Sequence, residues 1–171
     1  MILPDFLAPD PENARLRLIF CGTAPGHVSA ALGHYYAGPG NRFWGLLHRA
    51  GLTPRLFSPK EDHLLPGLGI GLTDLAKAVS GMDRDIPASA YAPGALAERV
   101  AALAPVVMAF TSLKAARTAL ADDRIAAGPV PPQGRFPGVA LWALPSPSRA
   151  NGHFSEVPWL DLGRWWQEDW Q

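Results

Sequence analysis

The most informative part of the chain is residues 16–26, which read LRLIFCGTAPG. The short apolar run that Gly22 stops predicts a strand entering a sheet, because turn residues bound buried strands. Residues 22–40, which follow, are rich in glycine and proline and show no helical pattern, so we expect a long loop there. Open α/β sheets bind ligands at loops that follow the carboxyl ends of strands, which makes this loop the first candidate site.

Strand-like and helix-like patterns alternate along the rest of the chain. Their alternation predicts an α/β fold, a three-layer α/β/α sandwich with a mostly parallel central sheet. Residues 1–14 are rich in proline and acid and are expected to form an irregular lead-in, with a single domain over residues 15–171. Further strands are predicted at 106–110 and 139–144, and residues 68–75 are expected to form a short strand or an extended segment that brings Asp74 to the edge of the sheet. Helices are predicted from Asn41 to Gly51, over 95–103, from a cap at Ser112 to Leu120, and over 159–166.

Composition bounds the class of protein. With 171 residues and a mass of 18.3 kDa, the chain has the size of one ordinary domain. Hydrophobic residues make up 48% and charged residues 18%, which excludes disorder throughout the chain and a highly charged coiled coil. Fifteen basic and fifteen acidic side chains give a formal net charge of zero, so contact with a polyanion would depend on local clusters or on backbone amides.

Cysteine and histidine usage argues against a metal centre. Cys21 is the only cysteine, which excludes disulfides, a thiolate zinc site and a four-thiolate iron–sulfur cluster. His27, His34, His63 and His153 lack ligand-type spacing, so no metal site is expected. No cofactor is expected either. A reducing cytoplasm is the expected location, since the start shows no signal peptide and no apolar stretch is long enough to span a membrane.

Two strand-end loops are expected to open on one edge of the sheet. The first is the loop after residues 16–21, and the second is residues 145–151, PSPSRAN, after the last predicted strand. The first loop offers glycines that let backbone amides approach a ligand, with aromatic residues close behind it. The second offers hydroxyls, fixed proline geometry and one cation. Such a pair suits a flat aromatic heterocycle with a phosphate-bearing chain alongside, as in nucleic acid.

These two loops carry a family resemblance. Residues 22–26, GTAPG, followed by residues 35–44, YYAGPGNRFW, resemble the first motif of the mismatch-specific uracil-DNA glycosylase and thymine-DNA glycosylase family. That motif runs Gly-x-Asn-Pro-Gly and continues to an aromatic residue, Pro-x-Asn and Phe-Trp. Residues 144–148, LPSPS, resemble the second motif, Leu- or Met-Pro-[Asn/Ser]-x-Ser. The resemblance spans most of the chain and implies the fold of the uracil-DNA glycosylases.

The resemblance also implies roles for individual residues. Tyr36 falls where the family stacks an aromatic ring on a base flipped out of DNA. Thr23 and the backbone amides of Gly22 and Ala24 would read the edge of the base, and Asn41 would lie beside the base or brace the loop. Ser148 would hold a phosphate oxygen, and residues 149–151 would fill the space that the base leaves. The implied DNA-binding positions are Gly26, Ser146, Ser148, Arg149, Ala150 and Asn151.

One departure from the family concerns catalysis. The first-motif Asn, which positions the attacking water in the family, is Ala24 here. Residues 71–75, GLTDL, resemble the family's Gly-x-Thr-x-Leu segment and carry Asp74 at its variable position. Breaking a base–sugar bond develops positive charge on the deoxyribose, and a carboxylate can stabilise that charge and orient water, so Asp74 is the candidate catalytic residue. The alternative is structural, with Asp74 capping a helix that starts at Leu75.

The leading hypothesis is a monofunctional DNA glycosylase, acting as a monomer, that removes uracil from double-stranded DNA containing uracil or a mismatch and leaves an abasic site. With Ala24 in place of Asn, hypoxanthine, thymine or a modified pyrimidine is an alternative substrate base. A protein that binds lesions or abasic DNA without chemistry is a second hypothesis, and an enzyme of free nucleosides or nucleotides is a third. Residues 82–85, MDRD, are expected to form a solvated turn.

Overall fold

A five-stranded sheet forms the centre of the fold. The computed structural model describes residues 2–8 and 15–170. The strands are β1 (Leu18–Gly22), β2 (Ile70–Asp74), β3 (Val107–Phe110), β4 (Gly128–Val130) and β5 (Ala140–Ala143). They lie in the order β2-β1-β3-β5-β4, with β2, β1, β3 and β5 parallel to one another and β4 antiparallel to β5. The predicted α/β fold with a mostly parallel sheet is therefore confirmed.

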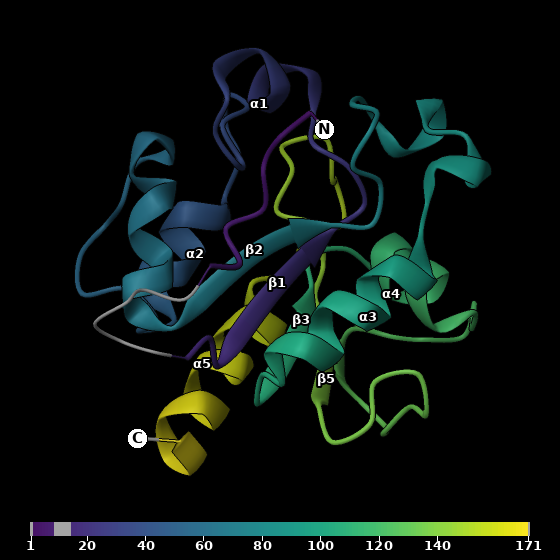
Figure 1. The fold of residues 1–171 in the computed structure, drawn as a ribbon. Helices are drawn as coiled ribbons and strands as arrows, with labels where there is room; N and C mark the ends of the chain where they lie inside the picture. Colours follow the sequence, from purple (N-terminus) through teal and green to yellow (C-terminus); the bar gives the residue numbers. More distant parts are fainter. Residues whose placement is uncertain (1, 9–14, 171) are drawn as a thin grey trace.

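Helices cover both faces of this sheet. The helices α3 (Pro93–Leu103) and α4 (Leu113–Leu120) lie on one face, and α2 (Phe43–Arg49) and α5 (Val157–Trp170) lie on the other (Figure 1). Ser112 caps α4 as predicted, because its Oγ accepts a hydrogen bond of 3.0 Å from the backbone N–H of Ala115. Three short 3₁₀ helices, Pro59–Leu68, Asp83–Asp85 and Ala88–Ala90, lie in the connections between these elements.

Neighbouring residues of β1 point into different cores, as alternating side chains of a doubly covered strand must. Ile19 belongs to the core under α3 and α4. Phe20 belongs to the other core, where its ring lies 5.3 Å from the ring of Phe43 in α2 and 5.9 Å from that of Trp159 in α5. The apolar run that predicted a strand is thus buried on both sides, which holds the following loop on a rigid base.

One α-helix and one strand were not predicted from the sequence. Residues 22–40, expected to be a loop without helix, contain α1 (His27–Leu32), which ends at Gly33 in the left-handed region with φ of 75°. Ser29 is its only buried residue, so α1 shows no apolar stripe that periodicity could detect. The strand β4 was also missed, because it has three residues with proline at its centre, a composition tolerated only at the edge of a sheet.

The described part of the N-terminal segment, residues 2–8, lies along the free edge of β2. Phe6 and Leu72 exchange two backbone hydrogen bonds of 3.0 Å, and the N–H of Ile2 donates to the carbonyl oxygen of Lys77 at 2.8 Å. Leu3 is buried. The predicted lead-in spans residues 1–14, of which residue 1 and residues 9–14 lie outside the described part of the chain. Within residues 2–8 and 15–170, no helix has the length and apolarity that crossing a membrane requires.

Close packing of α5 on the end of α2 makes a stability prediction. A Cβ added to Gly163 of α5 would lie 2.2 Å from the carbonyl oxygen of Ala50. We therefore expect Gly163→Ala to lower the free energy of unfolding by roughly 1–3 kcal/mol, measured by urea denaturation. Gly45→Ala is the control, since its Cβ would meet only the flexible end of Arg49 at 3.3 Å. A neutral Gly163→Ala would contradict the observed helix contact.

Candidate active site

A cavity of about 460 Å³ opens at the carboxyl ends of the parallel strands, within the usual size range of small-ligand sites. Both predicted loops contribute to its wall, so their expected meeting at one edge of the sheet is confirmed. Arg149 is exposed and is not among the lining residues; its side chain lies against Gly40. The sequence-predicted site residues that line the cavity are Gly22, Thr23, Ala24, Gly26, Tyr36, Asn41, Asp74, Ser146, Ser148, Ala150 and Asn151.

Three polar groups converge above Gly22, the last residue of β1. Gly22 is the register partner of Asp74 at the end of β2. A Cβ at Gly22 would lie 2.9 Å from Oδ1 of Asp74, 3.3 Å from Oγ1 of Thr111 and 3.5 Å from the hydroxyl of Tyr36. The missing side chain of glycine is what lets a carboxylate, a hydroxyl and a phenol share this space.

The carboxyl group of Asp74 is buried, with 3% of the residue exposed. Burial raises its pKa from the ordinary value of 3.8 to about 6, although the nearby Lys77 ammonium opposes this shift and the Asp5 carboxylate adds to it. The residue is not a helix cap, because residues 75–80 contain no helix. Instead, the N–H groups of Leu75 and Ala76 donate to the carbonyl oxygens of Gly22 and Thr23 at 2.9 and 2.8 Å.

Lys77 connects Asp74 to the N-terminal segment. Its Nζ lies 2.7 Å from Oδ1 of Asp5, 3.1 Å from the hydroxyl of Tyr35 and 3.4 Å from Oδ2 of Asp74. Asp5 also accepts a hydrogen bond of 2.8 Å from the hydroxyl of Thr73. Two carboxylates therefore share one ammonium, and the N-terminal segment takes part in setting the electrostatics of the site.

Tyr36 has an unusual backbone conformation for an aromatic residue, with φ of 52°. Its ring stacks on Phe43, with ring centroids 3.8 Å apart and an interplanar angle of 19°. Its hydroxyl lies 2.9 Å from Oγ1 of Thr111, within hydrogen-bonding distance. Such strain persists only where surrounding contacts determine the conformation, and outliers of this kind cluster at functional sites.

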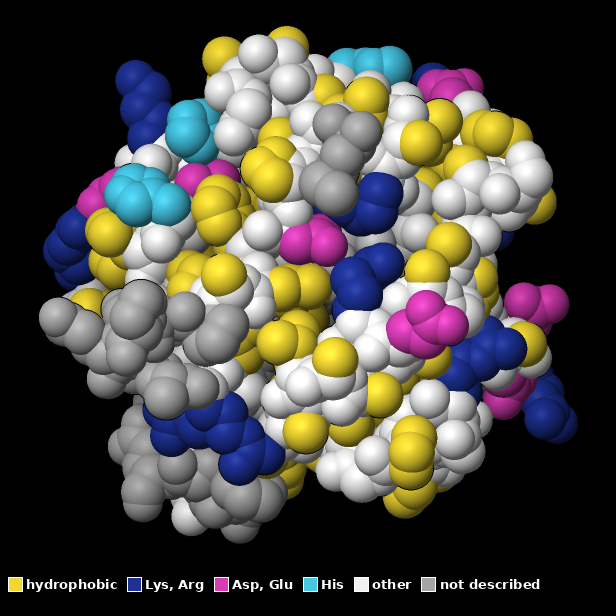
Figure 2. Space-filling view, viewed as in Figure 1, with side chains coloured by type: hydrophobic (Ala, Val, Ile, Leu, Met, Phe, Trp, Pro, Cys, Tyr) yellow, Lys and Arg dark blue, Asp and Glu magenta, His cyan; other side chains and the backbone are white. Residues whose placement is uncertain are grey.

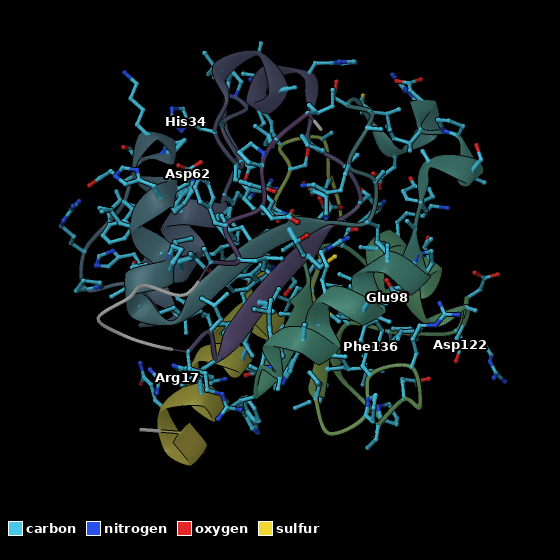
Figure 3. All side chains as sticks on the ribbon, viewed as in Figure 1. Arg17, His34, Asp62, Glu98, Asp122 and Phe136 are labelled. Carbon is cyan, nitrogen blue, oxygen red and sulfur yellow. The ribbon has the colours of Figure 1, made fainter. Side chains whose placement is uncertain are left out.

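Contacts on both sides of Tyr36 hold this conformation. The backbone N–H of Tyr35 donates to Oδ2 of the buried Asp62 at 3.0 Å, and His34 Nδ1 lies 3.2 Å from Oδ1 of the same carboxylate (Figure 3). On the other side, the N–H of Ala37 donates to Oγ of Ser29 at 2.9 Å. The turn that presents the Tyr36 ring is therefore fastened to α1 and to the 3₁₀ helix Pro59–Leu68.

Comparison with known protein families agrees with this geometry. The Uracil DNA glycosylase superfamily matches residues 9–168 of the chain. The chain belongs to this superfamily. Membership suggests DNA glycosylase activity, and DNA is the partner on which proteins of the superfamily act.

The side chain of Asn41 braces the end of the first loop, where α2 begins. Its side-chain oxygen accepts a hydrogen bond of 2.9 Å from the backbone N–H of Phe43 at the start of α2. The sequence left open whether Asn41 lies beside a base or braces the loop, and the two roles are compatible, because Asn41 also lines the cavity and its amide nitrogen is not used in this bond.

Hydrogen bonds from other elements hold the second loop, residues 145–151, in place. Trp159 of α5 donates from its indole nitrogen to the carbonyl oxygen of Pro145 at 2.9 Å. Arg42 donates from its guanidinium to the carbonyl oxygen of Ser148 at 2.8 Å. Asn151 uses both ends of its amide within the loop, donating to the carbonyl of Ser146 at 3.0 Å and accepting from the N–H of His153 at 3.1 Å. The loop is thus a rigid part of the cavity wall.

On the face shown in Figure 2, basic and acidic side chains are scattered among apolar and neutral ones. The presence of both signs on this face agrees with the zero formal net charge. Among the residues that the structure describes, no three His, Cys, Asp or Glu side chains gather in a way that could hold a metal ion.

Several site residues were not predicted from the sequence. Thr111 directly follows β3, so the rule that identified Gly22 and the 145–151 loop would also have identified it. Lys77 and Asp5 gave no such signal, because their contact depends on how residues 2–8 dock on β2. The turn at residues 82–85 is exposed, as expected, but Met82, Asp83 and Arg84 also line the cavity.

Proposed function

We propose that the protein is a monofunctional DNA glycosylase that takes a uracil flipped out of double-stranded DNA and hydrolyses its N-glycosidic bond. Tyr36 stacks on the base, and the first loop, with Thr23, contacts the base edge. The loop at residues 145–151 contacts the DNA beside the vacated position, with Arg149 at its exposed tip. The observation that carries this proposal is the convergence of Asp74, Tyr36 and Thr111 over Gly22 inside a cavity of suitable size.

The proposed reaction uses one water molecule and no cofactor. The water oxygen forms a bond to C1′ of the deoxyribose as the bond from C1′ to the base nitrogen breaks, and the electron pair of that bond leaves with the uracil. Asp74 accepts the water proton and stabilises positive charge on the sugar as the base departs. A carboxyl group with a pKa of about 6 is ionised at neutral pH and remains basic enough for this role.

The direct test is excision from a panel of labelled duplexes, each with one altered base, followed by alkaline cleavage of abasic sites. Uracil opposite adenine and opposite guanine is expected to yield alkali-labile product, and hypoxanthine and thymine duplexes measure how far Ala24 widens the range. Salt-dependent affinity for the same duplexes without any product would instead support the lesion-binding hypothesis, which Ala24 motivates.

Tyr36 provides a second test. We expect Tyr36→Ala to lower kcat/KM for uracil excision by roughly 10- to 100-fold, because base–aromatic stacking is worth about 1–3 kcal/mol per base. Tyr36→Phe is the matched control, since it keeps the ring and removes only the hydroxyl near Thr111. Single-turnover rates over a range of enzyme concentrations measure both variants. Equal losses in Tyr36→Ala and Tyr36→Phe would contradict a stacking role for the ring.

A further inference from the structure

The turn at residues 81–85 is built into the cavity wall. The backbone N–H of Gly81 donates to the carbonyl oxygen of Pro25 in the first loop at 2.9 Å. Gly81 has φ of 133°, and a Cβ there would lie 3.1 Å from the ring of His27. This close approach brings the side chains of Met82, Asp83 and Arg84 to the cavity. The turn therefore has a defined position relative to the residues that would contact a base.

One hydrogen bond joins this turn to the base-reading loop. The hydroxyl of Thr23 lies 2.6 Å from Oδ1 of Asp83. The Thr23 hydroxyl donates this hydrogen bond, and the Asp83 carboxylate oxygen accepts it. A threonine hydroxyl has one proton, and in Thr23 this proton is used in the hydrogen bond to Asp83. What Thr23, itself 7% exposed, can then offer to a ligand in the cavity is an acceptor lone pair and not a donor.

Deamination changes the group that such an acceptor meets. The ring nitrogen on the Watson–Crick edge of cytosine or adenine carries no proton and is an acceptor. In uracil and hypoxanthine, the products of their deamination, the same nitrogen carries a proton and is a donor. An acceptor fixed opposite this position pairs with the deaminated base and leaves two acceptors facing each other with the normal base, an arrangement that buried sites reject strongly.

We propose that Asp83 is a specificity-determining residue that acts through Thr23, by orienting its hydroxyl so that the site selects bases with an imino N–H. This inference rests on the proposed function, since it assumes that the cavity holds a nucleobase. It predicts that the site distinguishes uracil from cytosine and hypoxanthine from adenine, and it gives the turn at residues 82–85 a role beyond solvation.

The test compares binding of two duplexes that differ in one base, 2′-fluoro-deoxyuridine or 2′-fluoro-deoxycytidine. The fluorine destabilises positive charge on the sugar, so the base is not cleaved and equilibrium affinity can be measured. The wild-type protein is expected to prefer the uracil duplex by roughly tenfold or more. In Asp83→Asn the amide can donate to Thr23 and release its hydroxyl proton, so we expect this preference to fall by about tenfold. The free energy needed to unpair the base differs between the two duplexes but not between protein variants. It therefore cancels when the uracil preference of a variant is compared with that of the wild-type protein.

Two further variants keep the test specific. Asp85→Asn removes the same charge from the same exposed turn and should leave the uracil preference unchanged. Thr23→Val removes the hydroxyl, and adding Asp83→Asn to it should change the preference no further, because Asp83 acts through Thr23. An unchanged preference in Asp83→Asn, or an equal loss in Asp85→Asn, would overturn the inference. The proposed function fails separately, if the wild-type protein removes no base from unmodified duplexes.

Discussion

Replacement of Asp74 by asparagine is expected to abolish most of the activity, lowering the single-turnover rate of uracil excision by roughly 10²- to 10⁴-fold. The carboxamide has the shape of the carboxylate but neither accepts the water proton nor carries charge to stabilise the sugar cation. Because only 3% of Asp74 is exposed and it lies beside Gly22 and Thr111 in the cavity wall, bulk solvent has poor access to replace its carboxylate. Quench-flow or manual time courses at saturating enzyme measure the rate. Full activity in Asp74→Asn would exclude a catalytic role.

The same variant carries its own folding control. The native pKa of Asp74 is about 6 and its ordinary value is 3.8, so between these pH values the native protein binds more protons than the unfolded chain. Ionised Asp74 therefore destabilises the fold as pH rises through this window, fully so above about pH 6. At pH 7, Asp74→Asn is expected to be more stable by roughly 1–3 kcal/mol in thermal or urea unfolding. Loss of activity with a gain in stability separates chemistry from misfolding.

The architecture of the site was accessible from sequence because it depends on local patterns. The apolar run before Gly22 and the one before Pro145 each predicted a strand, and parallel strands place the loops after them at one edge. The strand before Thr73 placed Asp74 at the same edge. Once these three strands are correct, the convergence of the loops on a cavity follows from topology.

The electrostatic partners of the site could not be found in this way. Asp5 meets Lys77 only because residues 2–8 dock antiparallel on β2, and Asp83 meets Thr23 only because Gly81 is fastened to Pro25. No periodicity or motif encodes either contact. The turn at residues 82–85 was therefore interpreted as solvated, which its exposure agrees with, while its place in the cavity wall depends on tertiary structure.

The interpretation of Ala24 combines the sequence resemblance with the tertiary structure. The resemblance places the water-positioning Asn at this position, where the chain has only a methyl group. The register of β1 and β2 places the Asp74 carboxylate beside Gly22, two residues before Ala24, and both residues line the same cavity. We therefore propose that the Asp74 carboxylate at the end of the neighbouring strand supplies the polar group that Ala24 cannot provide.

If Asp74 acts as the carboxylate, the pH profile of excision should show it. With a pKa of about 6, the rate is expected to be flat above this pH and to fall about tenfold for each further unit below it. Burial and the Asp5 carboxylate raise the pKa of Asp74, whereas the Lys77 ammonium and a hydrogen bond from Tyr35 lower it. Single-turnover rates between pH 4.5 and about 8.5, in buffers of constant ionic strength, locate the midpoint.

Two substitutions should move that midpoint in opposite directions. Lys77→Met removes the ammonium that lowers the pKa of Asp74, so the midpoint should rise. Asp5→Asn removes a carboxylate that raises this pKa and also competes for Lys77, so the midpoint should fall. A loss of structure would change the plateau rate but would not shift the two variants to opposite sides of the wild-type midpoint. If both variants keep the wild-type midpoint, the titrating group is not Asp74.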